Sequence, residues 1–324
     1  MKRKCGEMPN ASYTSRWAKT KSTMTINIPE LLKVKPISIE GRNGKVYSYS
    51  RKSKSFDFYT DQFKGNKEFK IGSGIQKEDL SKSPKEMVDA ITFLQNKVKP
   101  EAFILELGGS KHQRRSGFPY AFFNNYVPLD ISLSSVTEYC ELYDRIGIAC
   151  DAQKLPLEDG VVDAIFTHTF LEHPLNPDLV VKEIDRVLKK GGILIHSDAW
   201  HCRWWKRLGI YGVKKWNDMM AKEKLLFLII SIVEMKVIRF PLIITQRFFK
   251  ELTVSKKQQK DLVYKKLTPN YELKLYSDED AAASIDPIDL IRFYEQRGYK
   301  TVYKKSFLKR IFFNHTSVYL IKGN

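Results

Sequence analysis

The sequence is poor in cysteine and contains no long uninterrupted apolar run. Its four cysteines, Cys5, Cys140, Cys150 and Cys202, have no C-x-x-C spacing and no nearby histidine cluster. This pattern argues against a zinc site or a disulfide framework and fits reduced thiols in a cytosolic compartment. The basic first residues are not followed by the apolar segment of a secretory signal. We therefore expect a cytoplasmic protein without a metal ion.

The composition is that of a folded protein. Of the 324 residues 43% are hydrophobic, which suffices for a sizeable core and excludes wholesale disorder. The length predicts two domains, or one large domain with insertions. We divide the chain into a basic N-terminal extension with short β elements and a hairpin (1–83), the first part of a core (84–199), a helical insertion (200–270) and the last part of the core (271–324).

Positive charge is concentrated in two segments. Residues 1–70 carry 16 basic and 6 acidic side chains and residues 201–270 carry 16 and 5, whereas residues 71–200 carry 14 and 19. Such basic flanks attract phosphate groups on nucleic acid, on anionic lipid or on a phosphorylated metabolite. The alternative is a solvated basic surface without a partner.

Short apolar runs alternate with helical patterns from residue 84 onward. A helical period covers 84–97. A second helix, with apolar residues at 179, 180, 184, 187 and 188, is expected to end at Gly191-Gly192. The expected strands lie at 102–107, 126–130, 146–150, 161–166 and 192–196, with two late β-like runs at 299–303 and 315–321. This order predicts an α/β fold with a doubly wound, mostly parallel sheet.

Acidic residues follow several of these strands. Glu106 precedes Gly108-Gly109, Asp130 closes the second strand and Asp151 closes the third. Ligands of open α/β sheets sit beyond the carboxyl ends of the strands, so these carboxylates and Thr167-His168 should ring one crevice. A carboxylate at Asp130 can accept two hydrogen bonds from a ribose diol.

Five pieces in order and spacing resemble one family. They are Leu105-Glu-Leu-Gly-Gly, Leu129-Asp-Ile-Ser, Asp151-Ala-Gln-Lys-Leu-Pro-Leu, Val162-Asp-Ala-Ile-Phe-Thr-His-Thr-Phe-Leu-Glu-His and Lys182-Glu-Ile-Asp-Arg-Val-Leu-Lys-Lys-Gly-Gly. The stretch from Leu105 to Ser197 resembles the class I S-adenosylmethionine-dependent methyltransferases of the small-molecule type. The resemblance implies a Rossmann-like sheet of seven strands with the last one antiparallel, and S-adenosylmethionine as cofactor.

The resemblance also implies roles for single residues. The candidate cofactor contacts are Glu106, Gly108, Gly109, Ser110, Asp130, Ile131, Asp151, Ala152 and Thr167. Glu106 and the glycine loop would hold the methionine part, Asp130 the ribose, and Ile131, Asp151 and Ala152 the adenine. The loop departs from the family pattern because Ser110 and His112 replace two glycines. Asp130 as a helix cap and Asp151 as a turn carboxylate are the alternative interpretations.

His168 and His173 are the candidate catalytic residues. Both follow the fourth expected strand, next to where the methyl group would lie, and an imidazole that titrates near neutrality can take a proton from an acceptor hydroxyl. The alternative for His173 is a structural hydrogen bond within its loop. The candidate acceptor contacts are Asp278 and Asp280, which resemble a segment of glycan-pathway methyltransferases, together with Trp200; a solvated acidic loop is the alternative.

Residues 200–250 combine tryptophans and basic residues with the apolar run from Leu225 to Val233. Charges at Glu234, Lys236 and Arg239, followed by Pro241, interrupt what would otherwise be a membrane span, so we reject a transmembrane helix. Two interpretations stay open: a helix pair at an anionic membrane surface, and a lid that packs on the sheet.

The sequence thus predicts a cytoplasmic S-adenosylmethionine-dependent methyltransferase, with the cytoplasmic membrane face as an alternative location. Its acceptor would be an oxygen of a small molecule or of a glycan, lipid-linked if the membrane interpretation holds. Two rival hypotheses are a nucleic-acid methyltransferase and a non-catalytic protein that keeps the fold. Against the first, the sequence has no Asn-Pro-Pro-Tyr-like tetrad and no paired catalytic cysteines.

Overall fold

The structure is a computed structural model, and it describes most of the chain. The described residues are 26–41, 45–49, 59, 85–109, 123–210, 214–253, 261–272, 278–302, 308, 311–312 and 317–324.

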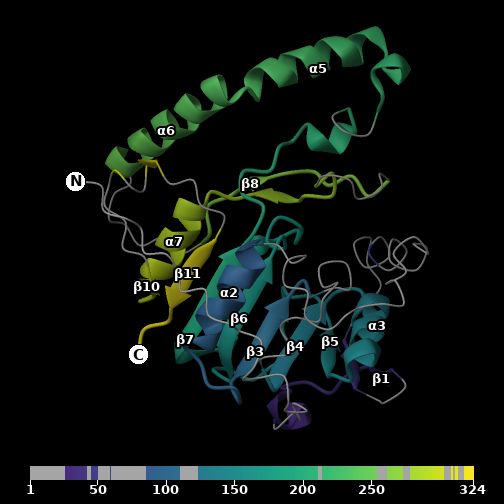
Figure 1. The fold of residues 1–324 in the computed structure, drawn as a ribbon, viewed down its shortest axis with the longest axis vertical. Helices are drawn as coiled ribbons and strands as arrows, with labels where there is room; N and C mark the ends of the chain where they lie inside the picture. The colour runs from purple at the N-terminus through teal and green to yellow at the C-terminus, as the bar shows by residue number, and fades with distance from the viewer. Residues whose placement is uncertain are drawn as a thin grey trace, which may run out of the picture.

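A nine-stranded sheet forms the centre of the protein (Figure 1). Its strands, in spatial order, are β1 (Ser38–Glu40), β2 (Val46–Ser48), β5 (Gly147–Ala149), β4 (Asn125–Asp130), β3 (Phe103–Leu107), β6 (Val162–His168), β7 (Leu188–Ser197), β11 (Val318–Ile321) and β10 (Lys300–Thr301). The six strands from β2 to β7 run parallel, and β11 is antiparallel to both of its neighbours. The predicted α/β fold with a mostly parallel sheet is therefore confirmed.

The predicted number of seven strands is wrong, because the N-terminal hairpin joins the sheet. Strand β1 pairs with β2 in antiparallel register, and β2 pairs in parallel with β5, with Val46 opposite Gly147 and Ser48 opposite Ala149. Strand β5 would otherwise expose unpaired backbone groups at the sheet edge, and the hairpin satisfies them. Val46 is buried against Val136, Cys140 and Ala149, so the extension also shares the core.

Four helices cover the two faces of the sheet. They are α2 (Lys85–Gln95), α3 (Leu133–Tyr143), α4 (Pro177–Val187) and α7 (Pro287–Glu295). Apolar residues of α2 pack with Ile104 of β3 in one core cluster, whereas those of α4 and α7 pack with Leu105 and Leu107 in another. Successive residues of a strand point to opposite faces, so a strand flanked by helices on both sides is apolar throughout. This explains the continuous apolar runs in the sequence.

Two further helices extend away from the sheet. They are α5 (Ala221–Val233) and α6 (Lys236–Thr253), which form a long arc at one end of the molecule (Figure 1). Most of their large apolar side chains are exposed, so they do not form a lid that buries its apolar face on the sheet. In the part of the chain that the structure describes, no helix is both long and apolar enough to cross a bilayer.

Small elements complete the fold. They are the 3-10 turns η1 (Ile28–Leu31), η6 (Lys206–Leu208) and η7 (Trp216–Asp218), and a two-stranded sheet of β8 (Lys265–Lys266) and β9 (Ala283–Ser284).

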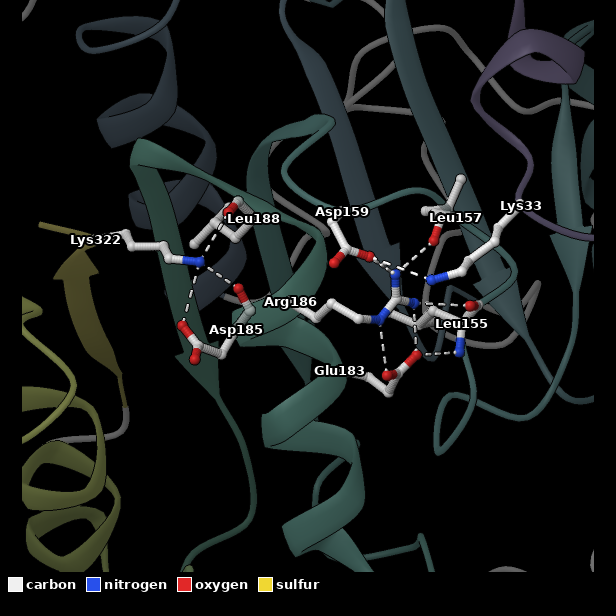
Figure 2. A network of polar contacts seen from close by, with 9 residues as sticks. All are labelled: Lys33, Leu155, Leu157, Asp159, Glu183, Asp185, Arg186, Leu188 and Lys322. Carbon is white, nitrogen blue, oxygen red and sulfur yellow. Dashed lines mark hydrogen bonds and ion pairs between the residues drawn. The ribbon is translucent and has the colours of Figure 1, made fainter. Parts of the chain in front are cut away.

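Arg186 of α4 holds the segment that follows β5. Figure 2 shows its guanidinium donating to Glu183 Oε2 at 2.7 Å, to Asp159 Oδ1 at 2.7 Å and to the carbonyl oxygens of Leu155 and Leu157 at 2.9 and 2.7 Å. Glu183 in turn accepts the backbone N–H of Leu155 at 2.8 Å. Because two of these acceptors are backbone carbonyls, Arg186 fixes the path of the 151–160 segment against α4. In the same view Lys322 donates to the carbonyls of Asp185 and Leu188, and so ties the chain beyond β11 to the end of α4.

We expect Arg186→Ala to lower the free energy of unfolding by about 2–4 kcal/mol, since it leaves a partly buried carboxylate and two carbonyls without their donor. Urea unfolding followed by circular dichroism measures the change. Asp159→Ala is the matched control: Asp159 is exposed, so its loss should leave the unfolding midpoint near that of the original chain. Equal stability of Arg186→Ala and the original chain would refute the structural role.

A site at the carboxyl ends of the parallel strands

The turn after β3 is tightly constrained. Gly108 has φ +75°, and a Cβ atom at this position would lie 2.8 Å from Phe170 Cδ2. A Cβ on Gly109 would lie 2.9 Å from Cβ of Pro128 and 3.1 Å from Glu106 Oε2. Both glycine N–H groups donate to the carbonyl of Leu129, at 2.8 and 3.0 Å. Only glycine therefore fits here, and the chain turns directly against the end of β4. Ser110 and His112 lie outside the described residues.

Glu106 lies beneath this turn. Its side chain is fully buried, and its Oε2 atom accepts a hydrogen bond from the hydroxyl of Tyr126 on the neighbouring β4, at 2.7 Å. This bond fixes the carboxyl group at the base of the glycine turn.

Asp130 stands at the end of β4, half-buried. Its Oδ1 atom accepts the backbone N–H of Ser132 at 2.8 Å. The N-cap of α3 is Ser132, whose hydroxyl accepts the N–H of Ser135, so Asp130 does not itself cap the helix. Burial raises the pKa of Asp130 to about 6, against the lowering effects of the Ser132 N–H and of His173. Ile131 follows directly and connects β4 to the cap.

Asp151 and Ala152 follow β5. The carboxylate of Asp151 accepts the backbone N–H of Gln153 at 2.9 Å and is exposed, which is the local turn that we held open as its alternative role. Ala152 is buried in the main core. The segment that carries both residues is the one braced by Arg186.

Thr167 belongs to a buried polar network below the strand ends. Its hydroxyl donates to Asp198 Oδ2 at 2.8 Å and lies 2.8 Å from Nδ1 of His196. The other carboxyl oxygen of Asp198 accepts the N–H groups of Phe170 and Leu171, at 3.0 and 3.2 Å. Asp198 thereby holds the loop after β6 in place. Sequence reasoning missed this residue, although an acid directly after a buried strand was the available signal.

His173 and Asp280 form the most polar part of the site. Nδ1 of His173 lies 2.8 Å from Oδ2 of Asp280, and Nε2 lies 3.7 Å from Oε1 of Glu172. The hydroxyl of Tyr59 donates to Asp280, and the Tyr59 ring contacts the His173 ring edge to face. Burial lowers the pKa of His173, but the carboxylates of Asp280 and Glu172 outweigh it and raise the pKa to about 10. Burial raises the pKa of Glu172 above its ordinary value.

Asp130, at the end of β4, interacts electrostatically with these groups. The charge of His173 lowers the pKa of Asp130, and Asp130 and Asp280 both contribute to the raised pKa of Tyr59. The structure therefore brings Asp130, His173 and Asp280 into one neighbourhood. Glu172 and Tyr59 are members that the sequence analysis did not single out as site residues.

The other candidates lie around this centre. Asp278 has φ +58°, and its carboxylate accepts a hydrogen bond from Nζ of Lys206 at 2.8 Å. Trp200 packs, partly buried, against the main core. His168, at the end of β6, stacks on Phe166, and its Nδ1 lies 3.4 Å from the hydroxyl of Ser197. Among the described residues no group of three or more His, Cys, Asp or Glu side chains could hold a metal ion.

Comparison with known proteins identifies the domain. Residues 105–196 match the family model described as a methyltransferase domain, which confirms the resemblance. Malonyl-(acyl-carrier protein) O-methyltransferase of a Marinomonas species is 31% identical over 75 residues, covering 22% of this chain and 28% of that protein. Sterol 4-C-methyltransferase of Caenorhabditis elegans is 45% identical over 51 residues, covering 16% and 15%. The chain thus spans less than a third of either relative.

Solved structures with similarity include a phosphoethanolamine N-methyltransferase of Haemonchus contortus in complex with S-adenosylmethionine. It is 22% identical, with a TM-score of 0.29, and the alignment covers 35% of this chain and 28% of that one.

We expect the free energy of unfolding to fall as the pH rises between about 8 and 10, by up to about 1.4 kcal/mol per pH unit from His173. Below about pH 8 Glu172, whose pKa is also raised, adds a slope of the same sign, so the His173 slope is measured above it. The folded protein holds a proton on His173 that the unfolded chain releases near pH 6.5, so this stabilisation is complete below 6.5 and lost as the pH passes 10. Urea titrations at several pH values measure the slope. His173→Asn should flatten it, whereas His168→Asn should keep it; the same slope in both variants would contradict the assignment to His173.

Proposed function

We propose that this chain, whose residues 105–196 form a class I S-adenosylmethionine-dependent methyltransferase domain, transfers a methyl group to an oxygen of a small molecule or a glycan. The observation that carries the proposal is the grouping of a half-buried carboxylate at the end of β4, Asp130, with the ion pair of His173 and Asp280. The carboxylate of Asp130 suits a ribose diol. The expected imidazole that titrates near neutrality is wrong for His173, whose pKa is about 10, so His173 can take a proton from an acceptor only in its neutral form, which is favoured at high pH.

The residues at the strand ends fit the cofactor. Gly108 and Gly109 turn the chain tightly against Phe170 and Pro128 and so set the end of β3 from which backbone groups would meet the cofactor. Asp130, ionised above about pH 6, would accept hydrogen bonds from the ribose hydroxyls. Ile131, Asp151 and Ala152 would surround the adenine, and Ser110 is a proposed contact. Thr167 is fully buried on Asp198, so we propose that it supports the cofactor site through Asp198.

When bound, S-adenosylmethionine supplies a methyl group on a positively charged sulfur, which is already activated for displacement. The work left to the chain is to align the acceptor, exclude water and remove a proton. In its neutral form His173 can take the proton on Nε2, while Asp280 holds its Nδ1 side at 2.8 Å. Asp280 thus orients the His173 ring and does not itself take the proton. We propose Asp278 and Trp200 as acceptor contacts beside this pair.

Among the named relatives the Marinomonas protein is an O-methyltransferase, whereas the Caenorhabditis elegans protein is a C-methyltransferase, so the oxygen acceptor is proposed from the site and not from the relatives. A cytoplasmic location is also part of the proposal, and the free, buried thiols of Cys140, Cys150 and Cys202 support it.

Asp130→Asn should weaken S-adenosylmethionine binding by about 1.5–3 kcal/mol, or roughly 10- to 150-fold, because a charge-assisted hydrogen bond becomes a neutral one. Binding to the original chain should also weaken as the pH falls below about 6, and the variant should lose this dependence. Isothermal titration calorimetry measures both.

Asp163→Asn is the matched control, since Asp163 lies at the opposite end of β6 and bonds Lys189 and the N–H of Phe103. It should leave the dissociation constant unchanged. Normal affinity in Asp130→Asn would remove the ribose assignment.

His173→Asn should lower kcat by about 100- to 10,000-fold. The affinity for S-adenosylmethionine is compared above pH 8, where Asp130 is ionised in both chains, and should be similar there. In the original chain kcat should rise with pH up to about 10, because only the neutral imidazole accepts a proton. Methyl transfer from tritiated S-adenosylmethionine to glycan and lipid extracts gives the rates. His168→Asn is run alongside; if it alone abolishes transfer, His168 is the base and the assignment to His173 is wrong.

A further inference from the structure

The helix pair α5–α6 presents a large apolar surface that the described residues do not cover. Leu225, Leu228 and Ile232 of α5 are 61%, 51% and 55% exposed, and Val237 at the start of α6 is 71% exposed. The exposed large apolar side chains of the pair are Leu225, Leu228, Ile229, Ile232, Val233, Val237, Ile238, Phe240, Leu242, Phe248, Phe249 and Leu252. Apolar patches of this size mark interaction sites.

One face of α5 is apolar and exposed to solvent. Leu228 and Ile229 lie three and four residues after Leu225 and four and three residues before Ile232, so these four exposed side chains share one helical face, whereas Ile230 is buried. Lys222 stands three residues before Leu225, and Lys236 stands four residues after Ile232. The apolar stripe is therefore flanked by cations at both ends.

Aromatic and basic side chains gather at the beginning of α5. The indole of Trp216 is 46% exposed, its ring lies edge to face with Phe227, and Nζ of Lys224 lies 5.5 Å from the ring centroid. Tryptophan beside lysine is the arrangement found at the headgroup level of a bilayer.

Ion pairs hold the helix pair at the side of the molecule where the site lies. Arg203, which follows β7, bonds Glu234 at the junction of α5 and α6 at 2.9 Å. Arg247 of α6 bonds Asp286, the N-cap of α7, at 3.1 Å. In Figure 1 the pair arcs above the ends of the parallel strands. The helix pair therefore lies on the side of the molecule toward which the parallel strands point (Figure 1).

We propose that α5 and α6 dock onto an anionic membrane surface, with the apolar stripe in the headgroup region and the lysines on lipid phosphates. The charge of the segment favours an anionic membrane over a second copy of the chain. The segment 201–270 carries 16 basic and 5 acidic side chains, so it attracts an anionic surface and repels a second copy of itself. Contact in the plane of the membrane also agrees with the finding that neither described helix could cross it.

Docking gives the proposed function a substrate class. If the chain is a methyltransferase, its site faces the bilayer, and the favoured acceptor is one that the bilayer presents, such as a glycan on a lipid anchor. This step rests on the proposed function, whereas the docking itself does not.

The docking is tested with the full chain and sedimented vesicles. The chain should bind vesicles of phosphatidylcholine mixed with phosphatidylglycerol at low salt, with weak binding to phosphatidylcholine alone and weaker binding at high salt. Leu228→Asp combined with Ile232→Asp should reduce binding more than about tenfold. Lys222→Ala and Lys236→Ala should each reduce it about fivefold.

Ile39→Asp is the matched control, since Ile39 on β1 is 56% exposed but lies on a sheet edge away from the helix pair. It should bind vesicles like the original chain. S-adenosylmethionine binding by each variant is measured separately, so that failure of docking and failure of the proposed function are distinguished.

Two results would overturn the proposal. One is equal binding to vesicles with and without phosphatidylglycerol, or none to either. The other is a stable dimer in sedimentation velocity, if the double variant Leu228→Asp with Ile232→Asp is monomeric. That result would show that the apolar face binds a second copy of the chain.

Discussion

Parallel pairing of β3 with β4 and β6 is the constraint on which the site depends. Since these strands run in one direction, their carboxyl ends meet at one edge, and every residue that follows a strand is delivered there. Glycine at 108 and 109 lets the chain turn against β4 without a clash. Asp198 then holds the loop after β6 through two backbone N–H groups. The backbone of the site is thus held in place by the protein's own contacts.

Buried charge is concentrated where the chemistry would occur. Glu172, His173 and Asp280 lie together, and an isolated ion in such a place would be strongly destabilising. The imidazolium offsets part of this cost, which is why its pKa rises while that of Asp280 falls despite burial. Two non-glycine residues with positive φ, Thr169 and Asp278, flank the same cluster. Local strain combined with buried charge is typical of a site that is retained for function rather than for stability.

Sequence reasoning succeeded where the signal was local. The apolar runs and glycine turns predicted β3 to β7 and the presence of α4, because a strand buried on both faces must be apolar at consecutive residues. The expected helix end at Gly191-Gly192 was wrong, since α4 ends at Val187 and β7 begins at Leu188. It did not predict where the hairpin β1–β2 lies, because the sequence of an edge strand does not specify the strand with which it pairs. The pair His173–Asp280 and the contacts of Arg186 to carbonyl oxygens were equally out of reach, because they join segments that only the folded chain brings together.

The environment of the helix pair α5–α6 was also not predictable from the sequence. The sequence of α5 is apolar on nearly every side, since Ser231 is the one polar residue from Leu225 to Val233, and it is compatible both with packing on the sheet and with contact to lipid. What separates the two is the polar attachment of the pair. Arg203 with Glu234, Arg247 with Asp286 and Lys250 with Asp289 join it to the core through charged side chains. A helix fastened through its charged residues keeps its apolar residues on the outer side, where water would oppose them and a bilayer surface would not.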